Sequence, residues 1–89
     1  MGKEKPTDAE LVRRVRSGDK RAFDPLVERY QETARRVAMG MVANEEVARD
    51  LVQEALLQAY LSLRHLREAE RFKSWLYGIV LNVCRSTTS

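Results

Sequence analysis

Two acidic side chains, Asp50 and Glu54, lie four residues apart, a spacing that places both carboxylates on one face of a helix. Such a pair carries acid–base chemistry only when a nucleophile or a histidine stands nearby. The one histidine, His65, and the one cysteine, Cys84, do not have the spacing of metal ligands, and the four glycines are scattered. We therefore expect no catalytic residues, no metal and no cofactor, and a binding protein rather than an enzyme.

A second set of polar side chains is suited to nucleic acid. Arg71 and Arg85 supply guanidinium groups, Ser74 a hydroxyl and Asn82 an amide, which are the donors that phosphate oxygens and base edges accept. Gly78 lies among them, where a helix interior would cost roughly 1 kcal/mol relative to alanine. Either a ligand approaches closely at Gly78 or a neighbouring helix packs there, and the sequence leaves both open.

The composition indicates one small domain with a mildly basic balance. The 89 residues carry 16 Lys and Arg against 13 Asp and Glu, a net charge of +3 that permits nucleic-acid contact without demanding it. The charges are unevenly placed, since acids prevail over residues 45–54 and bases over residues 64–85. We expect one end of the fold to be acidic and the other basic.

The location follows from what the sequence lacks. A single cysteine excludes an intrachain disulfide. Nothing near Met1 combines a basic start with an apolar run, and no stretch approaches the roughly 20 apolar residues of a membrane span. We expect a cytoplasmic protein with no membrane span.

The elements that position these side chains are predicted to be helices, because apolar residues recur at three- and four-residue steps along most of the chain. We predict an all-α fold, a compact bundle of about four helices. The expected helices cover residues 8–16, 20–42, 45–63 and 70–86, with a flexible N-terminus at 1–7, a loop over most of 64–71 and a tail at 87–89.

Several helix ends have recognisable caps. Thr7 and Glu10 match a capping box, in which each side chain bonds the other residue's amide. Gly18 suits the left-handed conformation that ends a helix, and Asn44 is the expected N-cap of the third helix.

The second helix has two possible starts. Asp19 is the predicted N-cap, and Pro25 then lies inside the helix and kinks it. Alternatively Asp24 is a second cap, with Pro25 at the first helical position.

The third helix has two different faces. The core face consists of Ala48, Leu51, Val52, Ala55, Ala59 and Leu63. The opposite face consists of Glu46, Asp50, Gln53, Glu54, Leu57 and Leu61. Two leucines beside three acids suit a basic partner with an apolar centre, but stray surface leucines are also common, and the pattern alone does not decide.

The fourth helix divides in the same way. Its core side consists of Phe72, Leu76, Ile79, Val80 and Val83. The polar set of Arg71, Ser74, Asn82 and Arg85 lies opposite, and the pattern favours Trp75 as part of the core rim over a platform for stacking bases.

Three blocks of this sequence resemble the second conserved region of bacterial sigma factors, especially the extracytoplasmic-function group. They are DLVQEALLQAY at residues 50–60, FKSWLYGIVLN at residues 72–82, and the opening LVRRVRSGDKRAF at 11–23 followed by LVERY at 26–30. The resemblance covers residues 8–85, and the three ordered blocks have the family's spacing.

The resemblance implies two binding surfaces. In this family the helix with the Asp-x-x-Gln-Glu pattern docks on the clamp helices of the largest catalytic subunit of RNA polymerase, which assigns that role to Asp50, Gln53, Glu54, Leu57 and Leu61. The following loop and helix bind the melted, single-stranded −10 promoter element and hold a base outside the stack. Carried over, the DNA-binding residues are His65, Leu66, Arg67, Glu68, Arg71, Ser74, Asn82 and Arg85, with Ala69 and Glu70 in the same loop.

The loop departs from the family at two positions. Leu66 stands where an aromatic residue is common, and Glu68 stands where glycine is common. An aromatic ring stacks on a base, worth roughly 1–3 kcal/mol, whereas a leucine only packs against it.

The resemblance also implies a larger protein and further partners. Family members carry a second domain for the −35 element, which these 89 residues do not contain, and many are held by an anti-sigma factor. The competing hypotheses are a sigma-like interaction module that never touches DNA, and a small helical protein that binds duplex grooves. A preference for single-stranded non-template DNA distinguishes the sigma domain from both.

Overall fold

Residues 5–88 are described by a computed structural model, and every regular element among them is helical. The α-helices are α1 (Asp8–Arg16), α2 (Phe23–Val42), α3 (Glu45–Leu61) and α4 (Phe72–Thr88). Three short 3-10 turns, η1 (Lys20–Ala22), η2 (Leu63–His65) and η3 (Ala69–Arg71), lie in the connections. The predicted all-α bundle of four helices is confirmed.

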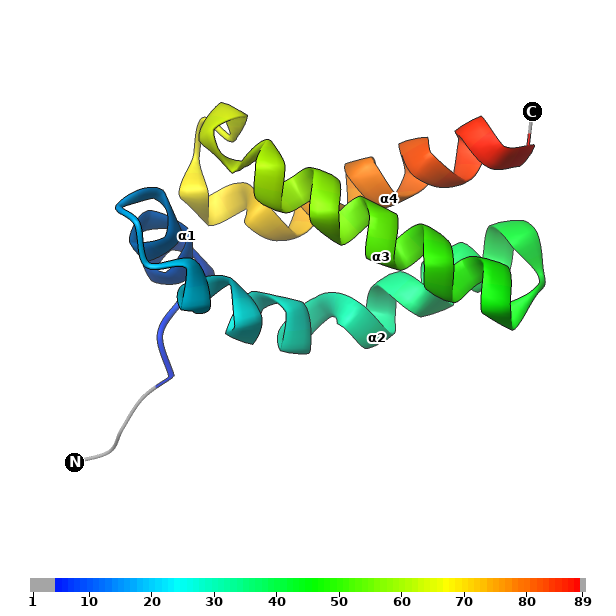
Figure 1. Ribbon diagram of the computed structural model, residues 1–89, viewed down its shortest axis with the longest axis horizontal. Coiled ribbons are helices and arrows are strands. Elements are labelled where there is room, and N and C mark those ends of the chain that lie inside the picture. The colour runs from blue at the N-terminus through cyan, green and yellow to red at the C-terminus, as the bar shows by residue number, and fades with distance from the viewer. Residues whose placement is uncertain (1–4, 89) are drawn as a thin grey trace.

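The three long helices lie side by side along the long axis of the molecule, each antiparallel to the next (Figure 1). The dimensions are 45 × 28 × 18 Å. The short helix α1 packs at one end, next to the turns η2 and η3 that join α3 to α4. The residues that make this contact are far apart in the sequence. The contact holds the predicted DNA-binding loop beside α1.

The predicted caps at three helix ends are confirmed. Thr7 accepts a bond from the Glu10 amide at 3.1 Å, and Glu10 accepts one from the Thr7 amide at 2.9 Å. Asn44 accepts from the Val47 amide at 3.0 Å, which satisfies one of the free donors that begin α3. Gly18 follows α1 with φ = +112°, a conformation that glycine adopts without steric cost.

The predicted start of the second helix is wrong in both of its forms. Asp19 makes no side-chain cap bond, and it precedes the 3-10 turn η1. Helix α2 begins at Phe23, so Pro25 lies in its first turn. The amides of that turn have no helical partner in any case, so proline causes no kink there and Asp24 need not be a cap.

The end of the fourth helix also differs from expectation. Helix α4 continues through Ser86 and Thr87, whose hydroxyls donate to the carbonyls of Asn82 and Val83 one turn earlier. These bonds within the helix keep short polar side chains compatible with helical backbone. Of the predicted tail, residues 87 and 88 are helical and residue 89 lies outside the described residues, as does most of the predicted flexible N-terminus.

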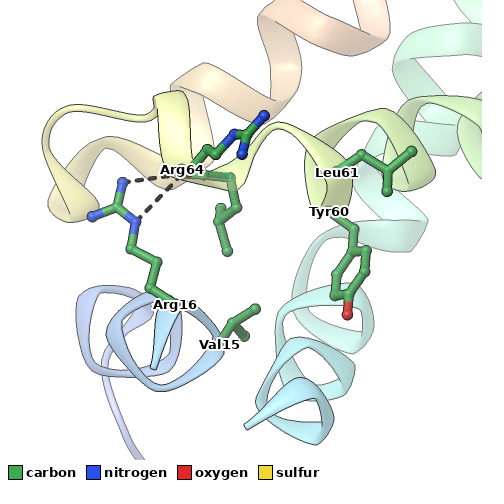
Figure 2. A pocket seen from close by; sticks show the side chains of 6 residues that line it. Val15, Arg16, Tyr60, Leu61 and Arg64 are labelled. Carbon is green, nitrogen blue, oxygen red and sulfur yellow. Dashed lines mark hydrogen bonds between the residues drawn. The ribbon is translucent and has the colours of Figure 1, made fainter. Parts of the chain in front are cut away.

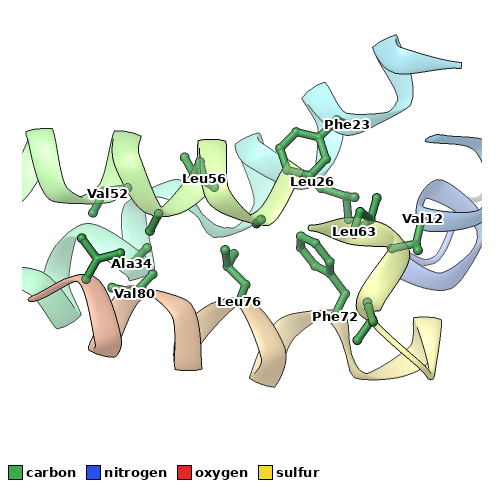
Figure 3. Close-up of a cluster of buried hydrophobic side chains, with 14 of the residues drawn as sticks. Val12, Phe23, Leu26, Ala34, Val52, Leu56, Leu63, Phe72, Leu76 and Val80 are labelled. Atoms are coloured by element: carbon green, nitrogen blue, oxygen red, sulfur yellow. The ribbon is translucent and has the colours of Figure 1, made fainter. Parts of the chain in front are cut away.

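The core lies where α2, α3 and α4 face one another and extends to α1, and Phe72 lies toward the α1 end of it, near Leu63 and Val12 (Figure 3). Its ring is fully buried and lies 6.2 Å from the ring of Phe23, 6.0 Å from Tyr30 and 6.1 Å from Trp75. Burying such aromatic surface stabilises a small helical domain, and ring pairs at these distances add to that effect. No polar or charged residue among those described is buried.

Helix α1 is held to α2 by a partly buried polar cluster. The Arg29 guanidinium donates to Asp8 at 2.8 Å and also to the Pro6 carbonyl, and the Tyr30 hydroxyl donates to the second oxygen of Asp8. Burial and the nearby carboxylate raise the pKa of Tyr30 to about 12. The cluster therefore fixes one end of α1, while its other end reaches the connection between α3 and α4.

Candidate functional site

The outward face of α3 forms a continuous stripe, which we call the α3 stripe. Its members, all exposed, are Asp50, Gln53, Glu54, Leu57 and Leu61. Over these residues the helix rises about 16 Å. The acids and the amide occupy the beginning of the stripe and the leucines its end, as the helical periodicity predicted.

The two leucines of the stripe are exposed to an unusual degree. Leu57 is 57% exposed and Leu61 65%, and with Val47 they are the large exposed apolar residues of the described part of the chain. All six residues predicted for the opposite, core-facing side of the third helix are buried, although Leu63 lies in η2, beyond the end of α3. Leu56, which the pattern assigned to neither face, is buried as well, because α3 packs against both α2 and α4 and so needs a wider apolar surface.

The connection between α3 and α4 carries the second candidate surface, the loop of residues 62–71. Leu63, Leu66 and Ala69 point into the core and are at most 5% exposed, while the polar residues between them are exposed. The Leu66 side chain packs mainly inside the protein, so only a small part of it is left on the surface of the loop. The hydrophobic residues of this loop are satisfied by the core before any ligand binds.

A hollow of about 420 Å³ opens where this loop meets the start of α4. Its lining consists of Leu66, Arg67, Glu68, Arg71, Ser74 and Trp75. Five of these were predicted DNA-binding residues, and the structure brings them together. Trp75, expected at the core rim, is half-buried against Phe72 and also forms part of this lining.

Polar groups around the hollow are held in place by short-range bonds. Arg71 forms an ion pair with Glu68 at 2.6 Å, and the Ser74 hydroxyl donates to the Arg71 carbonyl at 3.3 Å. Both residues of the ion pair are largely exposed, so it orients the guanidinium more than it stabilises the fold. A guanidinium, a hydroxyl and an indole side by side suit a base with its phosphate.

The remaining predicted DNA-binding residues lie outside this hollow. His65 is exposed in η2, and Asn82 and Arg85 are exposed two to three turns further along α4 than Ser74. Gly78 lies between Ser74 and Asn82 on α4, and a Cβ added to Gly78 would meet no atom within 4 Å. The hypothesis that Gly78 admits a neighbouring helix is therefore wrong, and this stretch of α4 is open to an approaching ligand.

Helix α1 contributes two contacts to the loop that the sequence did not reveal. The Arg16 guanidinium donates to the carbonyl of Leu63 at 3.0 Å and to the carbonyl of Leu66. Arg13 pairs with Glu70 at 2.8 Å. The pKa of the Glu70 carboxyl lies below its usual range. The larger cause is a hydrogen bond from the residue's own backbone amide, and the second is the hydrogen bond from the Arg13 guanidinium.

Arg16 also borders a second hollow, of about 570 Å³, on the α1 side of the loop (Figure 2). Its other lining residues are Val15, Tyr60, Leu61, Leu63 and Arg64. Figure 2 shows the Arg16 side chain reaching from the end of α1 to the backbone of the loop. The α3 stripe thus ends, at Leu61, beside the anchored loop.

Within residues 5–88, histidine, cysteine and acidic side chains nowhere gather in a group of three that could hold a metal ion. Cys84 is fully buried, and burial raises the pKa of its thiol. Over the same residues, no helix is both long enough and apolar enough to cross a bilayer.

Comparison with known proteins gives the class to which this arrangement belongs. Residues 26–87, well over half of the chain, match the family model described as sigma-70 region 2. The chain therefore belongs to the sigma-70 region 2 family, as the three sequence blocks predicted.

Similar proteins narrow the class to the extracytoplasmic-function (ECF) group. The chain is 40% identical over 79 residues to the RNA polymerase sigma-H factor of Pseudomonas aeruginosa, covering 89% of the chain and 41% of that protein. It is 39% identical over 83 residues to the ECF RNA polymerase sigma-E factor of Haemophilus influenzae and 40% identical to that of Escherichia coli K12, covering 93% of the chain and 43% of each relative. The chain thus spans less than half the length of these relatives.

Proposed function

We propose that this chain is a transcription initiation factor domain that docks on the clamp helices of RNA polymerase and holds the melted −10 promoter element. Membership of the sigma-70 region 2 family supports the general role. The observation that carries the proposal is the presence of two exposed surfaces of different chemistry, the acidic and apolar α3 stripe and the hollow lined by arginines, on adjoining elements. The first suits a protein partner, and the second suits a nucleotide.

Docking rests on the composition of the α3 stripe. The exposed leucines lie at the end of an acidic helix. When a basic, partly apolar helix pair covers them, their apolar surface is removed from water, which favours docking. Asp50 and Glu54 supply charge complementarity, which favours encounter and correct register. Clamp helices that present arginines around an apolar centre meet both requirements.

Base capture rests on the loop and α4. The phosphate backbone would be neutralised by Arg67, Arg71 and Arg85, and the hollow beside Trp75 would receive one unstacked base. Asn82 carries donor and acceptor atoms for a base edge. Unmelted duplex hides the bases, and flipping one costs a few kcal/mol, so the domain binds DNA strongly only when polymerase positions it.

This proposal makes the protein a binding component that works in the cytoplasm and needs no cofactor. Its other partners would be the domain that recognises the −35 element and an anti-sigma factor covering the same two surfaces. The chain covers 41% and 43% of the length of two of the relatives, which leaves room in such proteins for a further domain.

The test is titration of an isolated clamp-helix fragment with the wild-type chain and with Asp50→Ala, Gln53→Ala and Glu54→Ala. Each substitution should weaken binding without lowering the melting temperature, because all three side chains are exposed. Glu28→Ala is the matched control, since it removes an exposed acid from α2. Wild-type affinity in all three variants would overturn the docking assignment.

The state of the DNA separates the competing functions. With the clamp-helix fragment bound, the chain should retain single-stranded oligonucleotides better than the same sequences as duplex, and Asn82→Ala should change the ranking of retained sequences. Preference for duplex would indicate a groove-binding protein. Retention of neither would indicate an interaction module.

A further inference from the structure

Two side chains of α1 reach the loop of residues 62–71, and one of them, Arg16, bonds the loop backbone. Arg16, the last residue of α1, donates through Nη2 to the Leu63 carbonyl at 3.0 Å and through Nε to the same oxygen at 3.4 Å. Nη2 also donates to the Leu66 carbonyl. One guanidinium therefore bridges Leu63, the first residue of η2, and Leu66, which lines the hollow.

The same carbonyl takes part in the loop's own structure. The Leu66 amide donates to the Leu63 carbonyl at 3.1 Å, closing the 3-10 turn η2. Arg16 thus reinforces an oxygen that already defines the turn, and its charge strengthens the bond relative to a neutral donor. Without this guanidinium, the turn depends on two amide bonds, the second from the His65 amide to the Ser62 carbonyl at 2.8 Å, and on the burial of Leu63 and Leu66.

We propose that Arg16 is a positioning residue for base capture, an inference that rests on the function proposed above. It holds the backbone of residues 63–66 in the conformation that forms the hollow, so that the loop does not have to be ordered when DNA binds. Arg13 is a weaker support of the same kind, because its ion pair with Glu70 is 60% and 67% exposed and therefore largely screened. Ordering the loop beforehand raises affinity by removing an entropic cost from the binding step.

The variants follow from the geometry. Arg16→Ala removes all three donations, and Arg16→Lys keeps a charge with a single nitrogen that reaches one carbonyl at a time. Arg14→Ala is the matched control. Arg14 is an exposed arginine of the same helix, and none of its described bonds is to this loop.

The first measurement is hydrogen exchange of the Leu66 amide in the free 89-residue chain. Loss of a hydrogen bond with a charged donor should accelerate its exchange about tenfold in Arg16→Ala, less in Arg16→Lys and not at all in Arg14→Ala. Equal protection in Arg16→Ala and Arg14→Ala would overturn the inference, because the buried leucines would then suffice to hold the loop.

The second measurement is binding of a randomised single-stranded 12-mer pool to the chain on the clamp-helix fragment, across a range of salt. Arg16→Ala should bind the pool about tenfold more weakly with an unchanged salt slope. A slope reduced by about 0.7 would mean a direct phosphate contact, and would overturn a positioning role. If the wild-type chain retains no DNA, the proposed function fails, whereas amide exchange still decides whether Arg16 anchors the loop.

Discussion

Leu57 gives a quantitative test of docking, because its neighbour Leu56 carries the same side chain but points into the core. Leu57 is 57% exposed and Leu56 is 6% exposed. Complete burial of a leucine side chain is worth about 1.5–3 kcal/mol. Covering the exposed part of Leu57 on docking is therefore worth about 1–2 kcal/mol, which corresponds to a five- to thirtyfold change in Kd.

The assay is calorimetric titration of the clamp-helix fragment, with chemical unfolding of each variant in parallel. Leu57→Ala should raise Kd by that factor and change the free energy of unfolding by less than about 0.5 kcal/mol. Leu56→Ala should lower the free energy of unfolding by about 2–5 kcal/mol and leave Kd unchanged once it is referred to the folded fraction. Wild-type Kd in Leu57→Ala would refute the reasoning, because the α3 stripe would then remain in water in the complex.

Three further predictions concern single residues of the fold. The Tyr30 hydroxyl stays protonated in the folded chain to about pH 12 and ionises near pH 10 when unfolded, so its stabilising effect is complete below pH 10 and is lost between pH 10 and 12. Tyr30→Phe should therefore be less stable than wild type at pH 8, with a difference that shrinks above pH 10 in denaturant titrations; a constant difference would contradict this. The Cys84 thiol, buried and with a raised pKa, should react with a thiol reagent only at the rate at which the chain unfolds, and a fast reaction in the native state would show an opening of α4. Gly78→Ala should raise the free energy of unfolding by about 1 kcal/mol, because the added methyl meets no neighbour; an unchanged denaturation midpoint would refute it.

Features that depend on a few neighbouring residues could be predicted from the sequence. The capping box of Thr7 with Glu10, the cap at Asn44 and the left-handed Gly18 all involve contacts within one turn, and all are confirmed. The two faces of α3 followed from helical periodicity for the same reason. The helix cap predicted at Asp19 was wrong, because this residue precedes the short turn η1 and not a helix. An aspartate suits the start of either, and the local pattern does not separate the two.

Features that depend on packing between distant segments could not be predicted in this way. Leu56 is buried because α3 faces two helices at once, and Leu66 because the loop folds back over the core. Arg16 is one of three arginines within four positions of α1, and its sequence neighbourhood does not indicate which of them reaches residue 63. The grouping of Leu66, Arg67, Glu68, Arg71 and Ser74 was obtained from family resemblance, and the addition of Trp75 to their hollow required coordinates.

The acceptors that Arg16 bonds are main-chain oxygens, and that has a consequence for how this domain can change. Every amino acid presents a carbonyl, so the loop can exchange its exposed side chains at positions 64, 65, 67 and 68 without removing what Arg16 holds. Under the proposed function, sequence preference could therefore be changed by transplanting those positions from a relative, with the Arg16 bonds to the loop backbone left in place. Under the proposed function, the side chains that would choose the DNA sequence and the bonds that hold the loop belong to separate sets of atoms.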